Sequence, residues 1–215
     1  MNREEIIAQF DPNGVATNDT IFGLPWEAEH AQVVVLPIPW EVTVSYSAGT
    51  AGAPAAIKTA SYQVDLYDPA VPNAWQLGVW MAPEHEWLKW SSEELRSQAE
   101  SYINSLGDAK IVPDQIVRNR INQACAKMVA KVKKEALTYL NQGKLVALLG
   151  GDHSTPLGYL EALAEKHDSF GILQIDAHAD LREAYEGNPY SHASVMKRVV
   201  DEGIPLFQLG IRAFC

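Results

Sequence analysis

The sequence LVALLGGDHS at residues 145–154, followed by FGILQIDAHAD at residues 170–180, decides the fold. Each segment begins with a short apolar run and ends in a cluster of small, acidic and histidine residues. A short apolar run bounded in this way is typical of a strand that is buried on both faces, as in a parallel sheet. We therefore predict strands at 144–149 and 170–175, with polar side chains at their carboxyl ends.

Strands and helices alternate on both sides of these two segments. A β-branched run at 32–37 predicts an earlier strand, and residues 206–210 predict a later one. Residues 117–141 carry apolar side chains at steps of three and four, which indicates an amphipathic helix. Shorter helices are expected at 54–60, 156–166 and 193–202. This alternation predicts an α/β fold, a three-layer α/β/α sandwich with a mainly parallel sheet that binds ligands beyond the carboxyl ends of its strands.

The chain of 215 residues suits one domain with an N-terminal extension. Residues 1–31 show no sustained period, and we interpret them as an irregular N-terminal arm that packs on the body. Residues 32–215 form the domain itself. Within it, residues from about 75 to 114 are interpreted as a Trp-rich insertion or a subunit-contact element, with a short helix that starts at Ser92.

The charge balance bears on possible partners. Seventeen basic and 27 acidic residues give a formal charge of −10, which opposes binding to nucleic acids and anionic membranes and favours a small cationic substrate. No apolar run approaches the ~20 residues that span a bilayer. Cys125 and Cys215 are too few for a disulfide scaffold, and no signal-peptide pattern follows Met1. We expect a reduced, cytoplasmic protein.

The two polar clusters predict a metal site. If the chain stays extended after residue 175, Asp176, His178 and Asp180 project to one side, because side chains in a strand alternate with period two. His153 would approach from the neighbouring strand. Mixed imidazole and carboxylate ligands suit Mn²⁺, Ni²⁺, Fe²⁺ or Zn²⁺. The alternative is a set of buried polar groups without a metal, which is disfavoured because burying unpaired ionisable groups is costly.

Through GGDHS at 150–154 and DAHAD at 176–180, the sequence resembles the ureohydrolase family of arginases, agmatinases and formimidoylglutamases. The resemblance implies a binuclear centre of two divalent metal ions, manganese or nickel. It implies that His153 and Asp180 bind one ion, that His178 binds the other, and that Asp176 bridges the two. We also expect a homo-oligomer, a trimer or a hexamer.

The family's later Asp-x-Asp-x-x-Asp-Pro motif is not found before Cys215. That motif resembles the source of the remaining metal-binding carboxylates. We therefore expect these 215 residues to be the N-terminal part of a ureohydrolase domain, with four of six ligands.

The segment YSHA at 190–193 resembles the part of the family that contains a proton-shuttling histidine. His192 is therefore the candidate catalytic residue, which would protonate the departing nitrogen because the pKa of imidazole lies near working pH. The alternative is a polar residue at a helix N-terminus, with Ser191 as the cap.

The implied activity is hydrolysis of a guanidinium C–N bond with release of urea. Residues 36–46 and the Trp-rich stretch resemble the guanidine hydrolase branch, so guanidine is the expected substrate and agmatine the alternative. Trp40 beside the metals would offer a cation–π face, but Trp40 and the other tryptophans better suit core or interface positions, because each buries a large apolar area. A non-catalytic metal-binding or oligomerisation subunit is a further alternative. A zinc deacetylase is disfavoured, because the DAHAD spacing supplies bridging as well as terminal ligands.

Overall fold

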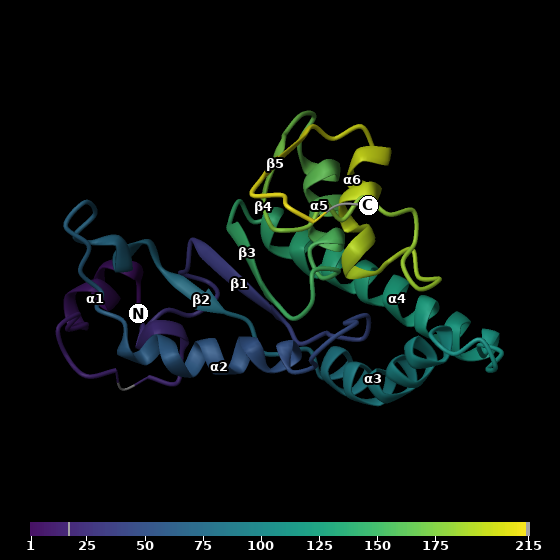
Figure 1. The fold of residues 1–215 in the computed structure, drawn as a ribbon. Helices are drawn as coiled ribbons and strands as arrows, with labels where there is room; N and C mark the ends of the chain where they lie inside the picture. Colours follow the sequence, from purple (N-terminus) through teal and green to yellow (C-terminus); the bar gives the residue numbers. More distant parts are fainter. Residues whose placement is uncertain (17, 214–215) are drawn as a thin grey trace.

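The computed structural model describes residues 1–16 and 18–213, so the last two residues of the predicted domain, Phe214 and Cys215, lie outside the described residues. Strands and helices alternate along most of the chain (Figure 1). In chain order the elements are α1 (Arg3–Gln9), β1 (Val33–Ile38), α2 (Ala53–Ala60), β2 (Val79–Met81), α3 (Glu86–Leu106), α4 (Gln115–Leu140), β3 (Leu145–Gly150), α5 (Leu157–Lys166), β4 (Ile172–Ile175), α6 (Val195–Asp201) and β5 (Leu206–Leu209). The predicted strands are confirmed as β1, β3, β4 and β5, and the predicted helices as α2, α4, α5 and α6.

The strands form two parallel sheets instead of one. The first has the order β2-β1-β3, and the second pairs β4 with β5 (Figure 1). In the first sheet Val33 lies opposite Leu145, and Ile38 lies opposite Gly150. Strand β1 is paired along both edges, and its side chains Leu36 and Ile38 are fully buried. The carboxyl ends of β1 and β3 therefore lie side by side.

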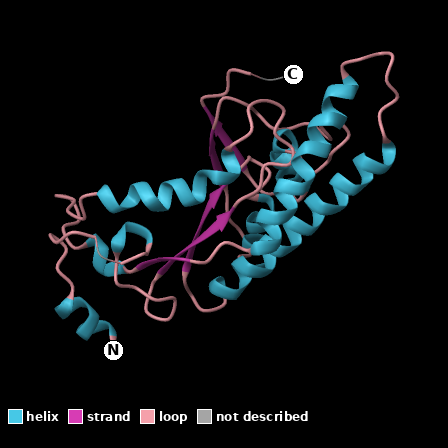
Figure 2. Cartoon of the chain, turned by 90° about the horizontal axis from the view of Figure 1, so that it is seen from below, coloured by secondary structure: helices cyan, strands magenta, loops and turns pink. Residues whose placement is uncertain are grey.

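Helices cover the first sheet. Figure 2 shows its strands between α2 and the pair of long helices α3 and α4. Helix α4 contacts β1 and β3 and also packs closely against α5. Gly158 permits this approach, because a Cβ atom there would lie 2.2 Å from the carbonyl oxygen of Val129. No helix in the described ranges is both long enough and apolar enough to cross a membrane.

The N-terminal arm was predicted to be irregular, but part of it is helical. Residues Arg3–Gln9 form a helix that begins with a capping box, in which Asn2 and Glu5 each accept a hydrogen bond from the other's backbone N–H. The arm packs against the body through a second hydrophobic cluster, which includes Ile6, Trp26 and Trp75. Apolar burial therefore holds the arm on the body, and the capping box stabilises its helix.

The Trp-rich segment is built into the sheet and its helix layer. Residues Val79–Met81 form the edge strand β2, which pairs in parallel with β1. The helix predicted to start at Ser92 begins instead at Glu86 and extends for 21 residues. Trp40, the tryptophan proposed to lie beside the metals, is fully buried and stacks on Trp87 with ring centroids 6.0 Å apart. Trp40 is thus a core residue.

The second sheet differs from the prediction that its strands are buried on both faces. Four apolar side chains of this sheet are exposed, namely Leu173, Ile175, Phe207 and Leu209. They alternate with less exposed residues such as Gln174, which is buried. One face of this short sheet is therefore exposed, and among the described residues β4 has only β5 as a strand partner.

Candidate metal centre

His153 is positioned by a tight turn after β3. A Cβ atom on Gly151 would lie 1.9 Å from the carbonyl oxygen of Trp40, so only glycine allows this close approach between the segments that follow β1 and β3. The same carbonyl accepts a hydrogen bond from the backbone N–H of Asp152 at 2.8 Å. The turn thereby fixes the backbone immediately before His153.

Asp176 and Asp180 are positioned by the loop after β4. The Oδ1 atom of Asp176 accepts a hydrogen bond from the backbone N–H of His178 at 2.8 Å. Asp180 adopts a left-handed backbone conformation with φ of 52°, which aspartate tolerates better than most residues. Its carbonyl oxygen accepts from the backbone N–H groups of Met196 and Lys197 at the start of α6. Asp180 is therefore tied to α6, and its carboxylate lies beside His153.

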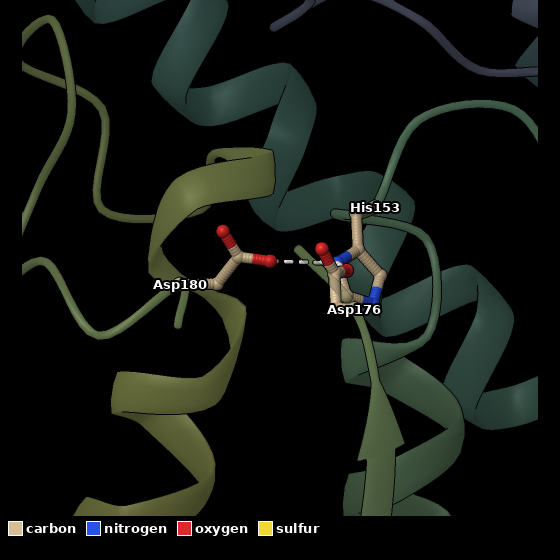
Figure 3. Close-up of side chains that lie close together, drawn as sticks. All are labelled: His153, Asp176 and Asp180. Carbon is tan, nitrogen blue, oxygen red and sulfur yellow. Dashed lines mark hydrogen bonds and ion pairs between the residues drawn. The ribbon is translucent and has the colours of Figure 1, made fainter. Parts of the chain in front are cut away.

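Three predicted ligands converge (Figure 3). One ligand atom from each of His153, Asp176 and Asp180 lies within 4.8 Å of the other two. The Nδ1 atom of His153 is 2.7 Å from Oδ2 of Asp180 and 3.2 Å from Oδ2 of Asp176. One imidazole nitrogen and several carboxylate oxygens fit a divalent ion such as Mn²⁺, Ni²⁺ or Zn²⁺. The donor set is therefore suited to a metal, and occupation by one stays a prediction.

The charges of these groups shift their pKa values in opposite directions. Burial alone would lower the pKa of His153, but its hydrogen bond to Asp180 and the nearby carboxylate charges raise it. Burial would raise the pKa of Asp176, but the hydrogen bond from His178 and the charge of His153 lower it. Both shifts favour the charged forms of the two groups.

His178 is the predicted ligand that does not join this group. Its side chain is 66% exposed, and its Nδ1 atom lies 3.5 Å from Oδ1 of Asp176. The prediction assumed an extended chain through residue 180, whereas the chain bends at Ala177 and the backbone of Asp180 is left-handed. His178 nevertheless lines the same cleft as the three converging residues.

The cleft has a volume of about 460 Å³. His192 lines it together with the three converging residues, so the candidate catalytic histidine faces the candidate metal centre. The ring of Tyr185 meets the ring of His192 edge-on, with centroids 5.5 Å apart. His192 is also the first residue of a short 3-10 helix, His192–Ser194, with Ser191 at the N-cap position, although the side chain of Ser191 makes no capping hydrogen bond.

Three residues around His192 were not predicted from the sequence, namely Thr43, Asp152 and Tyr185. Thr43 contacts both Asp152 and His192, and Tyr185 lines the cleft. Asp152 lies inside the GGDHS segment, and that position was the available signal for it. Nothing in the local sequence marked Thr43.

Residues 31–215 match the family model described as the arginase family. The chain belongs to the arginase family. One relative in this family is the N(1)-aminopropylagmatine ureohydrolase of Thermus thermophilus, which is 34% identical over 188 residues, or 86% of this chain and 52% of that protein. Another is the agmatinase of Bacillus anthracis, which is 29% identical over 187 residues, or 86% of this chain and 53% of that protein. The chain thus spans about half the length of the curated relatives it matches.

Solved structures of arginase-family proteins have the same fold. The agmatine ureohydrolase of Thermoplasma volcanium aligns with a TM-score of 0.63 and 23% identity, over 99% of this chain and 59% of that one. The arginase of Medicago truncatula aligns with a TM-score of 0.56 and 26% identity, over 86% of this chain and 52% of that one. The predicted α/β fold class and the resemblance to the arginase family are confirmed.

Proposed function

We propose that the whole protein is a metal-dependent ureohydrolase, which cleaves the guanidinium C–N bond of an agmatine-type substrate and releases urea. One observation carries the proposal: His153, Asp176 and Asp180 converge in a cleft that His192 also lines. The cleft combines candidate metal ligands with a group that can transfer protons.

The proposed cofactor is a pair of divalent ions, manganese or nickel. His153, Asp176 and Asp180 would hold them with His178, which lines the same cleft. Such ions, when bound, supply a hydroxide nucleophile near neutral pH, which a guanidinium carbon requires because its positive charge is delocalised. The carboxylates also attract a cationic substrate into the cleft.

His192 has the proposed role of general acid. The imidazole of His192 lies on the cleft wall, where it can hold a proton and deliver it to the departing nitrogen. Tyr185 limits rotation of this ring by packing edge-on against it. Protonation of the nitrogen makes it a neutral leaving group, so the bond breaks without forming an amide anion.

The proposed substrate is an amine that carries a guanidino group, in place of guanidine. The guanidine assignment rested on the resemblance of residues 36–46 and the Trp-rich stretch, and an aromatic face at Trp40 is not available to it, because this side chain is fully buried and does not line the cleft. The relatives named as agmatinase and aminopropylagmatine ureohydrolase favour the same choice.

A urea-release assay of the full-length protein tests the proposal. The panel contains agmatine, aminopropylagmatine, arginine and guanidine, after reconstitution with Mn²⁺ or with Ni²⁺. We expect kcat/KM for an agmatine-type substrate to exceed that for guanidine by tenfold or more, about 1.4 kcal/mol in transition-state binding. A preference for guanidine would restore the earlier assignment. Hydrolysis of none of the four would favour a non-catalytic subunit.

A further inference from the structure

A buried carboxylate behind the cleft links the segment after β1 to the turn after β3. Asp152 lies in the turn after β3, and its two oxygens accept four hydrogen bonds. Oδ1 accepts from the backbone N–H and the hydroxyl of Ser154. Oδ2 accepts from the backbone N–H of Thr43 at 3.2 Å and from its hydroxyl at 2.9 Å. All three side chains are at least 94% buried, since Asp152 is only 6% exposed, Thr43 5% and Ser154 1%.

The hydroxyl of Thr43 also meets His192. Its oxygen accepts a hydrogen bond from the backbone N–H of His192 at 3.2 Å. The Nδ1 atom of the His192 ring lies 3.4 Å from the same oxygen. The chain therefore contains a continuous path from Asp152 through Thr43 to the imidazole of the candidate catalytic residue.

The hydrogen atoms along this path can be counted. A hydroxyl has one hydrogen to donate and two lone pairs to accept. A carboxylate is an acceptor only, so the hydrogen of Thr43 goes to Asp152. The hydroxyl oxygen is then left as an acceptor toward Nδ1 of His192, which must carry a hydrogen to complete the contact. In the neutral ring Nε2 is then the basic nitrogen.

We propose that Thr43 is a positioning residue, which together with Asp152 holds His192 in the tautomer with hydrogen on Nδ1. The basic Nε2 atom is thereby available for proton transfer in the cleft. The proposal rests on the proposed function of His192 as the general acid. Asp152, which is not one of the three converging ligands, thereby has a role in orienting His192.

The opposite tautomer would be less favourable. It requires the Thr43 hydroxyl to turn its hydrogen toward Nδ1, across 3.4 Å, and to give up the bond of 2.9 Å to Asp152. A hydrogen bond to a charged oxygen is about twice as strong as one between neutral groups. The loss would also leave a buried carboxylate oxygen with one donor fewer. Both effects favour hydrogen on Nδ1.

Nitrogen NMR of the full-length protein tests the proposal directly. The protein is labelled with ¹⁵N-histidine and measured without metal near pH 8.5, where histidine is ordinarily neutral, at about two units above its usual pKa. The chain has six histidines, so the His192 signals are identified by their loss in His192→Gln. We expect the wild-type ring to carry its hydrogen on Nδ1. Hydrogen predominantly on Nε2 would overturn the proposal, whatever the catalytic activity.

Two variants of Thr43 separate the hydroxyl from the rest of the side chain. Thr43→Val keeps the shape but removes the hydroxyl, and it should shift the His192 ring toward hydrogen on Nε2. Thr43→Ser keeps the hydroxyl and should retain the wild-type tautomer. In the metal-loaded protein, Thr43→Val should lower kcat by about 10–100-fold and Thr43→Ser should restore most of it, the usual range for a group that orients an active residue. An unchanged tautomer in folded Thr43→Val would contradict the proposal.

Ser154→Ala is the matched control. It removes a hydroxyl from the same carboxylate, but at Oδ1 and without contact to His192. The tautomer should therefore remain unchanged. A shift as large as that of Thr43→Val would overturn the specific role of Thr43. If the wild-type ring carries hydrogen on Nδ1 and no substrate is hydrolysed, the positioning stands and the proposed function fails, so the two outcomes are distinguishable.

Discussion

The Nδ1 atom of His153 lies 2.7 Å from Oδ2 of Asp180, and a proton shared along this contact holds the loops after β3 and β4 together. A metal ion that used both groups would take the place of that proton, because an imidazole ligand must be neutral to coordinate. Metal binding and proton release should therefore be coupled at this site.

The first prediction concerns the pH dependence of metal affinity. The pKa of His153 is raised in the metal-free fold, since its contact with Asp180 outweighs the effect of burial. The protonated form competes with metal below that raised pKa, so affinity for Mn²⁺ should increase as pH rises through it. Calorimetry at about pH 6 and pH 8 in buffers of different ionisation enthalpy measures both the affinity and the released protons. Equal affinity and no proton release at the two pH values would contradict the coupling.

Asp176→Ala should remove most of the bound metal. We propose that this carboxylate bridges two ions, so its loss weakens both sites together. The measurement is metal analysis of the full-length protein after reconstitution in Mn²⁺ and in Ni²⁺. Asp168→Ala changes an exposed carboxylate outside the centre and should keep the wild-type content. A wild-type protein with fewer than one metal per chain would rule out the binuclear centre.

His192→Ala should separate catalysis from metal binding. We expect turnover to fall by ~10²–10⁴-fold, the usual range for the loss of a general acid or base, while metal content stays nearly constant. Steady-state urea release and metal analysis on the same preparation measure the two quantities. Loss of metal would instead make His192 a ligand, and unchanged turnover would remove it from the mechanism.

Gly151→Ala should destabilise the protein. Its Cβ would lie 1.9 Å from the carbonyl oxygen of Trp40, so the turn before His153 has to move. We expect the free energy of unfolding to fall by about 2 kcal/mol or more, measured by denaturant titration of the full-length protein. In the control Gly52→Ala, the new Cβ meets nothing within 4 Å and the backbone is right-handed, so a change within about 0.5 kcal/mol is expected. Similar losses in both variants would show that the close approach is not the cause.

The elements that the sequence predicts well have strong local patterns. Helix α4 repeats its apolar positions over 26 residues, and its observed bounds differ from the predicted ones by one or two residues. Strand β1 is a β-branched run whose side chains are nearly all buried. In both elements, the apolar positions of the sequence coincide with buried positions over most of the length.

The elements that were missed lack such a pattern. Helix α3 places Ser91 and Ser92 in buried positions, so small polar residues conceal its apolar period. Helix α1 has seven residues and buries only Ile6. Strand β2 has three residues and depends on its pairing with β1. The division of the strands into two sheets is likewise a matter of long-range pairing, which a local pattern does not contain.

The site residues likewise differ in how far the local sequence indicates them. The two motifs pointed to His153, Asp176 and Asp180, because each follows directly from a recognisable strand. The exposed side chain of His178 follows a bend at Ala177, which the local sequence does not indicate. The contact between Thr43 and Asp152 joins residues 109 positions apart, so only the folded chain reveals it.

The division of the strands into two sheets also has a consequence for motion. His153 follows β3 in the first sheet, and Asp176 follows β4 in the second, so coordinated metal would span their junction. Any fluctuation that parts the sheets would have to break that coordination, and metal binding to the native state alone adds to the cost of opening. Amide hydrogens in β3 and β4 should then exchange with solvent more slowly when metal is bound than when it is removed.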